Sequence, residues 1–351
     1  MSIGERIRHA RKLRALSLRE LADQVGVSHN AISKYEKGED VPSSGVIIRL
    51  ADALDVTPDY FFRDSSVKLQ EPSFRCKGKL AAREEKKLLA KIGDWLERYR
   101  EVEFIFEADG NRSFRFPRGF PMEVKTPEEV EVAAEKLRHT WDVGSDAIDD
   151  LISVLEDRAL RVFEVEEPKP FDGLIVPVEG GDYVIAVNSS FSGDHKRFSL
   201  AHELGHLLLR PARNLKPERA FHRFAAAFLV PRSVAFSRLG KQRRWLDINE
   251  LHLLKHEYGL SMQAWIRRAN ELNIISGDVQ GKLLTVFKVN GWAETEPGTE
   301  YPPERPRRME RLVYRALAER LISESGAFEL LGGPINRDFA PSNSGPAHNA
   351  N

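Results

Sequence analysis

The stretch that decides the fold runs Arg197-Phe-Ser-Leu-Ala-His-Glu-Leu-Gly-His-Leu-Leu-Leu209. Its apolar run predicts a buried helix, and it places His202, Glu203 and His206 in the order H-E-x-x-H. Because a helix advances about 100° per residue, the two imidazoles lie one turn apart on the same face. They can bind one Zn²⁺ and leave room for a third protein ligand and a water, with Glu203 placed to take a proton from that water. A helix with two incidental histidines would not explain Gly205, since a mid-helix glycine costs about 1 kcal/mol relative to alanine.

The third ligand is expected from the helix that follows. Pro211 ends the motif helix, because the residue before a proline is biased away from helical geometry, and the next helix is expected to begin near Pro217. Glu218 and His222 lie one turn apart on that helix, and either side chain could complete the site. A carboxylate would give the His₂Glu set of a hydrolytic zinc site. The alternative is that Glu218 is only a solvated acid that stabilises the helix N-terminus.

These two segments together are similar to a known family. The motif stretch, followed by Glu218-x-x-x-His-Arg-Phe-Ala-Ala-Ala-Phe-Leu-Val-Pro231, resembles the ImmA/IrrE metallopeptidases over about residues 126–280. The resemblance implies a zincin-like domain in which zinc is bound by His202, His206 and Glu218 and in which Glu203 is the catalytic acid/base. Members of that family cleave helix-turn-helix repressors, so the resemblance also implies a protein substrate of that kind.

Two more side chains are candidates for contacts with the substrate. The chain carries His222 where the family often has Asn, so His222 either supports a ligand, binds zinc itself or contacts the substrate. Asn188 ends the expected strand Tyr183–Asn188. His222 and Asn188 are the two candidates for stabilising the oxyanion. In zinc peptidases an edge strand beside the metal helix can pair with the substrate backbone, and this strand is our candidate. The alternative is a plain buried strand.

The first 63 residues predict five short helices in a helix-turn-helix arrangement. Ser17 and Ser28 stand at N-cap positions, and Gly26 stands at the tight turn between the second and third helices. The first nineteen residues carry six Lys and Arg against the single acid Glu5, so a basic patch exists although the net charge is +0. In this geometry the third helix reaches base edges. The expected base contacts are Ser28, His29, Asn30, Ser33 and Lys34, and the expected phosphate contacts are Arg8, Arg11, Arg14 and Arg19.

This N-terminal pattern also resembles a family. The segments Ser17-Leu-Arg-Glu-Leu-Ala-Asp-Gln-Val-Gly-Val-Ser28 and Ala31-Ile-Ser-Lys-Tyr-Glu-Lys-Gly38 are similar to the XRE family of phage-repressor-like regulators. The resemblance covers residues 1–63. It implies binding of a double-stranded DNA operator, usually as a homodimer on a two-fold-related site. A helical scaffold used only for protein contacts is the alternative.

Composition limits the class of protein. An apolar fraction of 41% and a charged fraction of 30% are ordinary for a soluble globular chain. A lone Cys76, which we interpret as incidental, excludes a disulfide framework and indicates a cytoplasmic protein. The N-terminus has no secretory pattern and no apolar run is long enough to span a bilayer, so no membrane partner is expected.

The expected fold class is mainly α with a small β-sheet (α+β), in several domains. Helices are expected from Thr126 to Thr140 and from Ser145 to Asp157, and strands at 160–164 and 173–177. Two helices joined at Gly259 to Ser261 close the metallopeptidase domain. The expected boundaries are a helix-turn-helix domain at 1–63, a connector with a charged helix at 64–124, a metallopeptidase domain at 125–280, an extension with a strand (283–289) and a helix (307–323) at 281–335, and a disordered tail at 336–351.

Two classes of function remain open at this point. In the first, the chain is a DNA-binding transcriptional regulator whose zinc endopeptidase domain cleaves a repressor or antitoxin-type partner, or itself. In the second, it is a non-proteolytic repressor or antitoxin whose peptidase-like domain only senses or binds.

Overall fold

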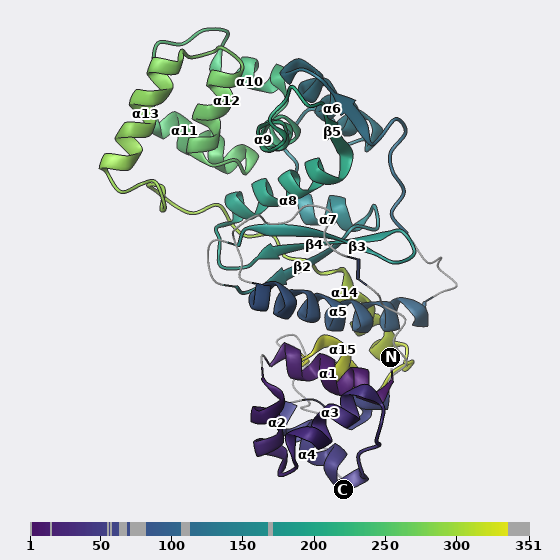
Figure 1. The fold of residues 1–351 in the computed structure, drawn as a ribbon. Coiled ribbons are helices and arrows are strands. Elements are labelled where there is room, and N and C mark those ends of the chain that lie inside the picture. Colours follow the sequence, from purple (N-terminus) through teal and green to yellow (C-terminus); the bar gives the residue numbers. More distant parts are fainter. Residues whose placement is uncertain are drawn as a thin grey trace, which may run out of the picture. The chain divides into compact units, whose positions relative to one another are not determined.

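The computed structural model describes residues 2–14, 16–54, 56, 58–62, 69–70, 82–106, 113–167 and 171–335 (Figure 1). The chain divides into two compact units, one formed by Met1–Trp95 with Arg112–Pro306 and the other by Leu96–Asn111 with Arg307–Asn351. Helices dominate and the sheets are small, which confirms the α+β class. The predictions for Cys76 and for the tail 336–351 lie outside the described residues.

The described part of residues 2–62 contains the expected five helical segments. They are α1 (Ile3–Leu13), α2 (Leu18–Val25), α3 (His29–Lys37), α4 (Ser44–Leu54) and the 3-10 helix η1 (Pro58–Phe62). The hydroxyls of Ser2, Ser17 and Ser28 each accept a hydrogen bond from the backbone N–H three residues on, which begins the first three helices. Gly26 has a φ of 69° and ends α2 in the left-handed conformation that glycine adopts without strain.

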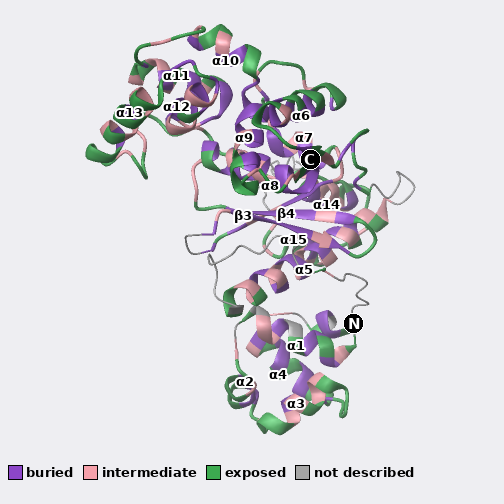
Figure 2. Ribbon diagram, turned by 45° about the horizontal axis from the view of Figure 1, so that its top comes forward, coloured by how far each residue is buried: buried purple, intermediate pink, exposed green. Residues whose placement is uncertain are grey.

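A small apolar core holds these helices together. Leu21, Val25 and Ile32 lie in the seam between α2 and α3, and residues of α1, α4 and η1 complete the cluster (Figure 2). Arg11 pairs with Glu36 through two hydrogen bonds of 2.5 and 2.9 Å and so ties α1 to α3. The apolar core and the Arg11–Glu36 pair therefore hold α3 against its neighbouring helices, and one face of α3 stays exposed.

The chain continues through nine α-helices and five strands up to residue 289, as far as the structure describes it. They are α5 (Ala82–Ile105), β1 (Met122–Val124), α6 (Pro127–Thr140), α7 (Leu151–Glu156), β2 (Arg161–Val165), β3 (Gly173–Val178), β4 (Asp182–Asn188), α8 (Gly193–Leu208), β5 (Leu209–Pro211), α9 (Pro217–Leu229), α10 (Arg232–Leu239), α11 (Ile248–Tyr258), α12 (Met262–Glu271) and α13 (Gly277–Val289). None of the described helices has the length and apolar character needed to cross a membrane.

The main sheet has the strand order β2-β4-β3, with β4 parallel to β2 and antiparallel to β3. The strand Tyr183–Asn188, which we expected at the edge, is therefore the central strand β4, and that prediction is wrong. Its run from Val184 to Val187 is buried throughout (Figure 2), as in a strand covered on both faces. Both of its edges already pair with neighbours, so it cannot add a substrate strand.

Helix α8 carries the H-E-x-x-H motif between the sheet and α9. It packs against β3 and β4, and α9 packs against it. A Cβ at Gly205 would lie 3.2 Å from Cδ1 of Phe224 and 3.5 Å from Cα of Phe221, both on α9. The mid-helix glycine thus permits the close crossing of the two helices from which the expected metal ligands come.

Two predicted elements differ in the structure. The helix expected from Ser145 is shorter and begins only after Asp150, whose carboxylate accepts from the N–H of Ser153. The strand expected at Leu283–Val289 is wrong, because α13 covers these residues. Ser276 caps that helix, and Leu283 and Phe287, one turn apart, supply its buried face.

The second unit contains the end of α5 together with α14 (Arg308–Ala318) and α15 (Glu324–Leu331). Arg98 of α5 donates to the carbonyl of Leu330 at 3.0 Å. The guanidinium of Arg315 lies 4.4 Å from the ring centroid of Phe106, a cation–π contact. The predicted helix from 307 is confirmed, but it ends at Ala318 rather than at residue 323.

Candidate metal centre

Helix α8 presents two imidazoles on one face. The side chains of His202 and His206 are 14% and 7% exposed, and their Nε2 atoms lie 3.1 Å apart. Burial, and then the charge of the neighbouring His222, lowers the pKa of His206 from 6.5 to about 4. That imidazole is therefore neutral near pH 7, which is the form that binds a metal ion.

Helix α9 brings a carboxylate to the same point. Glu218 follows Pro217, the first residue of α9. One of its oxygens lies 3.5 Å from Nε2 of His202 and the other lies 4.0 Å from Nε2 of His206. A tetrahedral zinc ion with bonds of 2.0–2.1 Å requires donor atoms about 3.3 Å apart. The three donors therefore fit a zinc ion with small movements of the exposed Glu218 side chain.

Glu203 is held beside these donors by the sheet. It is 8% exposed, and its Oε2 accepts a hydrogen bond of 3.0 Å from the backbone N–H of Ile175 on β3. A Cβ at Gly173 would lie 3.4 Å from Cγ of Glu203 and 3.3 Å from the carbonyl oxygen of Ala186. Because Gly173 has no side chain, the side chain of Glu203 has room beside β3.

His222 joins the same cluster, and Asn188 does not. The donor atoms of His202, Glu218 and His222 lie within 4.8 Å of one another, and the rings of His202 and His222 are 4.5 Å apart. The amide nitrogen of Asn188 donates to the carbonyls of Glu167 and Phe171 at 2.8 and 2.9 Å. Both of its N–H groups are thus used inside the fold, so the proposed oxyanion role of Asn188 is wrong.

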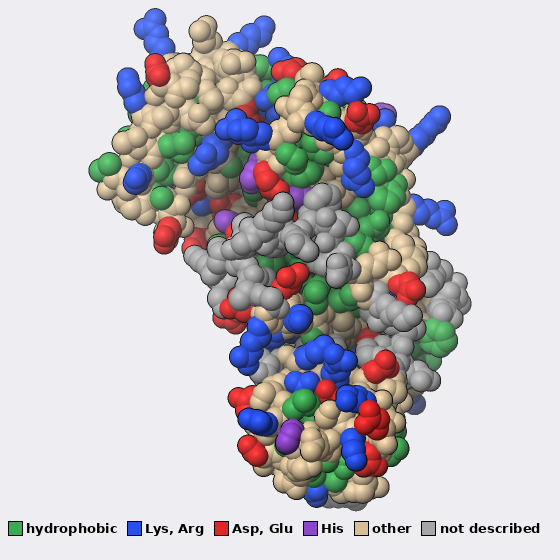
Figure 3. Space-filling view, viewed as in Figure 1, with side chains coloured by type: hydrophobic (Ala, Val, Ile, Leu, Met, Phe, Trp, Pro, Cys, Tyr) green, Lys and Arg blue, Asp and Glu red, His purple; other side chains and the backbone are tan. Residues whose placement is uncertain are grey.

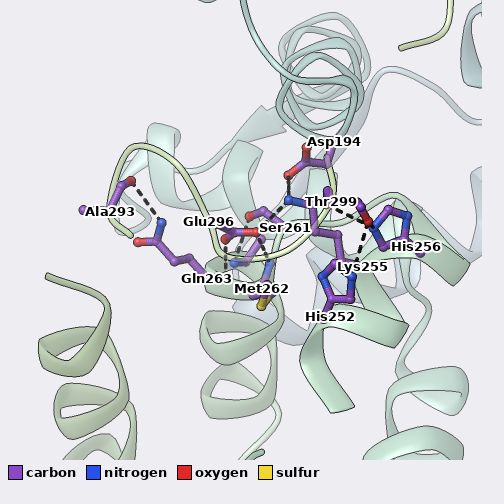
Figure 4. Close-up of polar contacts among 11 residues, drawn as sticks. Asp194, His252, Lys255, His256, Ser261, Met262, Gln263, Ala293, Glu296 and Thr299 are labelled. Atoms are coloured by element: carbon purple, nitrogen blue, oxygen red, sulfur yellow. Dashed lines mark hydrogen bonds and ion pairs between the residues drawn. The ribbon is translucent and has the colours of Figure 1, made fainter. Parts of the chain in front are cut away.

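The second histidine pair, on α11, has a structural role. His252 and His256 face Thr299, whose hydroxyl lies 3.0 Å from Nε2 of His256 (Figure 4). Beside them the buried Lys255 pairs with Asp194 at 3.6 Å and with Glu296 at 3.1 Å. Among the described residues, the groups of three that could hold a metal all lie on α8 and α9.

A cleft of about 1190 Å³ opens beside His222. Its walls come from α6, α8, α9 and α12 and from the segment 293–300. Lys216, Arg219 and Arg267 are exposed cations in its lining, and Figure 3 shows blue side chains gathered around histidines on this part of the molecule. The lining also contains acids, namely Asp194, Glu271, Glu294, Glu296 and Glu300, so the cleft that opens next to the metal donors has walls of mixed charge.

The helix-turn-helix segment presents polar groups on α3. Ser28, His29, Asn30 and Lys34 are exposed, Ser33 is half-buried, and the hydroxyl of Ser28 accepts from the N–H of Ala31. Arg19 is exposed as well. Arg11 differs, because its guanidinium is bound by Glu36 and by the carbonyl of Leu16.

Comparison with family models matches both regions. Residues 7–61 match the family described as Helix-turn-helix, and residues 162–270 match the family described as IrrE N-terminal-like domain. The chain joins a helix-turn-helix domain to an IrrE N-terminal-like domain. The second match includes His202, Glu203, His206, Glu218 and His222, so the whole cluster lies within the IrrE N-terminal-like domain.

Relatives of the helix-turn-helix domain are regulators. The HTH-type transcriptional regulator y4aM of Sinorhizobium fredii is 39% identical over 62 residues, which are 18% of this chain and 43% of that protein. The cryptic phage CTXphi transcriptional repressor RstR of Vibrio cholerae is 36% identical over 59 residues, 17% of this chain and 53% of that protein. A crystal structure of the P22 c2 repressor with a synthetic operator is 39% identical and covers 17% of this chain and 92% of that one, with a TM-score of 0.17. The chain thus spans about half the length of the curated relatives that it matches first.

The sequence did not predict the contacts that position Glu203. Gly173 and Ile175 position the glutamate of the IrrE N-terminal-like domain from a strand 28 residues earlier in the chain. The one local signal was a glycine at the start of a strand, which is typical of close backbone approach.

Proposed function

We propose that this chain is a DNA-binding transcriptional regulator whose IrrE N-terminal-like domain is a zinc-dependent endopeptidase. The observation that carries the proposal is the close approach of three side chains: Nε2 of His202 lies 3.1 Å from Nε2 of His206, and the two oxygens of Glu218 lie 3.5 Å from the first and 4.0 Å from the second. Glu203 lies beside the two histidines. Neutral imidazoles with one carboxylate are the donor set of hydrolytic zinc sites.

The protein residues divide the chemistry between them. Bound zinc would supply a Lewis acid that polarises a peptide carbonyl and makes water acidic enough to ionise near neutral pH. Glu203 takes the proton from the attacking water and passes it to the leaving amine. The N–H of Ile175 holds one carboxylate oxygen, which fixes the orientation of Glu203. We propose that His222, which lines the cleft, donates to the carbonyl oxygen under attack.

The proposed substrate is a helix-turn-helix repressor or antitoxin-type protein, cleaved to relieve transcriptional control. The resemblance to the ImmA/IrrE metallopeptidases supports this class, and the cleft beside His222 offers room for the peptide.

The proposed DNA partner is a double-stranded operator, bound by a homodimer through α3. The exposed polar residues of α3 and the relatives named as repressors support this. Two copies related by a two-fold axis would read half-sites about 34–36 Å apart. Asn30→Ala is expected to weaken operator binding by about 1–3 kcal/mol and to relax the preference at one base pair, measured by mobility shift against sequence variants.

The peptidase proposal is tested by metal content and by cleavage. Purified wild-type protein is expected to hold one zinc ion per chain and to cleave a co-expressed helix-turn-helix substrate, and His202→Ala should lose both. His256→Ala replaces a histidine of the second pair and should lose neither. A His202→Ala variant that still cleaves would overturn the proposal.

A second function is favoured by one observation, namely that the relatives are named as regulators and repressors. In it, the IrrE N-terminal-like domain binds a signal without hydrolysis. Glu203→Gln separates the two, because it keeps the zinc ligands and the DNA surface. Loss of the transcriptional response supports proteolysis, and an unchanged response supports the second function.

A further inference from the structure

The cleft beside the metal donors is lined by charges of both signs, and those buried in its walls are matched. Each of two buried cations lies between two carboxylates: Lys255 between Asp194 and Glu296, and Arg268 between Glu131 and Glu271 (Figure 4 shows the first group). The distances are 3.6 and 3.1 Å in the first group and 2.5 and 3.9 Å in the second. Because opposite charges cancel within each group, these pairs add little to the field inside the cleft.

Five exposed side chains of the lining are not matched in this way. Within the described part of the chain none of them takes part in a hydrogen bond or an ion pair, and they are the cations Lys216, Arg219 and Arg267 and the acids Glu294 and Glu300. The cations come from the start of α9 and from α12, and the acids come from the segment 293–300. These five charges are therefore available to a bound molecule.

The metal helix shows that the two signs lie at opposite ends of the cleft. At one end, His202 faces Glu218 in the first turn of α9, and that turn also carries Arg219. At the other end, Asp194 in the first turn of α8 lies close to Glu296, since one lysine binds both carboxylates. Asp194 precedes His202 by eight helical residues, which is about 12 Å along the helix axis.

Helix α12 shows the same separation. Glu296 accepts hydrogen bonds of 3.0 and 2.9 Å from two backbone N–H groups in the first turn of α12 (Figure 4). At the last turn, Arg223 of α9 donates to the carbonyl of Glu271 at 3.4 Å, and Arg267 stands one turn before that residue. The cations thus lie at the end of the cleft where α9 carries His222, and the acids lie roughly 12 Å away.

We propose that the cleft selects its substrate by charge, and that it takes a segment with an acidic side chain beside the scissile bond and a basic side chain three or four residues away. The proposal rests on the endopeptidase function proposed above. An extended peptide advances about 3.3 Å per residue, so three or four residues cover the 12 Å between the two ends. Lys216, Arg219 and Arg267 bind the acidic side chain, and Glu294 and Glu300 bind the basic one.

The selection depends on several weak contacts acting together. One ion pair between exposed side chains favours binding by about two- to fivefold, so both ends are needed for a clear preference. A segment with the two charges exchanged meets like charges at both ends and is rejected. The preference should decline as the salt concentration rises, because exposed charges are screened.

The test uses the full-length, zinc-loaded protein, a mixed library of unfolded peptides, and mass spectrometry that maps every cut. We expect Asp or Glu to be enriched within two residues of the cut, and Lys or Arg three to five residues from it on one side. Arg219→Glu should change the near preference from acidic to basic, and Glu300→Lys should change the distant preference from basic to acidic. Arg267→Glu makes the first change from α12, away from the ligand Glu218.

Arg244→Glu is the matched control, because Arg244 is an exposed cation that does not line the cleft. It should change neither preference. Where the folded helix-turn-helix partner is the protein that is cut, Arg219→Glu should slow that cleavage about fivefold and Arg244→Glu should not.

The outcomes separate this proposal from the endopeptidase function. Cuts without a charge preference, or a preference that Arg244→Glu alters as much as Arg219→Glu does, overturn the selection by charge alone. A zinc-loaded chain that cuts neither the peptides nor a helix-turn-helix partner overturns both proposals.

Discussion

The side chain of Glu218 is 67% exposed, whereas those of His202 and His206 are 14% and 7% exposed. The two imidazoles are therefore held in place by packing, and the carboxylate is the donor that is free to adjust. Solvent exposure of Glu218 also leaves the proposed metal position open to water and peptide.

At the residue scale, Glu218→Ala is expected to lower zinc affinity by more than tenfold without loss of fold, because one of three protein ligands is removed. Competitive titration with a chromogenic chelator measures this. The matched control is Glu128→Ala, since Glu128 follows Pro127 at the start of α6 as Glu218 follows Pro217 in α9. Equal zinc affinity in both variants would show that Glu218 is only a first-turn acid.

At the element scale, the crossing of α8 and α9 depends on Gly205. Gly205→Ala places a Cβ 3.2 Å from the ring of Phe224, so the helices must separate and the ligands on them diverge. Zinc affinity and thermal stability should both fall. Gly281→Ala is the control, because a Cβ in that helix meets nothing within 4 Å. It should stabilise the protein by about 0.5–1 kcal/mol. A Gly205→Ala variant as stable as wild type with full zinc affinity would contradict the argument.

A buried ion network joins α6, α9 and α12. Both Glu131 oxygens accept from Arg268, at 2.5 and 2.6 Å, and Arg223 donates to the same carboxylate at 2.8 Å. Burial alone would raise the pKa of Glu131, but the hydrogen bonds and charges of Arg268 and then Arg223 lower it overall. Since the folded pKa is depressed, the network stabilises the fold above the unfolded pKa near 4.5, and this contribution is lost as the pH falls below it.

Glu131→Gln is therefore expected to destabilise the protein at pH 7 by about 3–5 kcal/mol, because it leaves Arg268 buried without its charge partner. Urea denaturation at pH 7 and at pH 3.5 measures the difference between variant and wild type. The difference should shrink at the lower pH, because Glu131 of the unfolded wild-type chain is then largely protonated and must lose that proton on folding. A difference that is constant with pH would rule out the ionic explanation.

At the scale of the whole molecule, zinc is expected to stabilise one domain and not the other. Removing zinc with a chelator should lower the unfolding temperature of the IrrE N-terminal-like domain, by an amount that corresponds to about 2.7 kcal/mol when zinc is at 100 times its Kd. The helix-turn-helix domain has its own core and should keep its transition. Hydrogen exchange resolves the two domains, and equal protection with and without chelator would count against a zinc centre.

The sequence correctly predicted features that depend on residues within one or two helical turns of one another. The spacing of His202 and His206, the caps at Ser17, Ser28 and Thr126, and the turn at Gly26 all depend on local geometry with a fixed period. A short apolar run fits either a strand or a helix, and the wrong prediction of a strand at 283–289 has this cause. Five apolar residues in seven fit either period, and only the cap at Ser276 and the burial of Leu283 with Phe287 distinguish a helix from a strand.

By itself, then, the sequence determined which candidate metal donors lie one helical turn apart, because side-chain types and helical spacing are local properties. Only the tertiary structure decided which strand lies at the edge, which backbone N–H holds Glu203, and which segment binds the first turn of α12. Each of these joins residues 28 or more apart along the chain or depends on the order of three strands. No local pattern encodes such pairings, since the free energy that selects them comes from packing the whole sheet against α8.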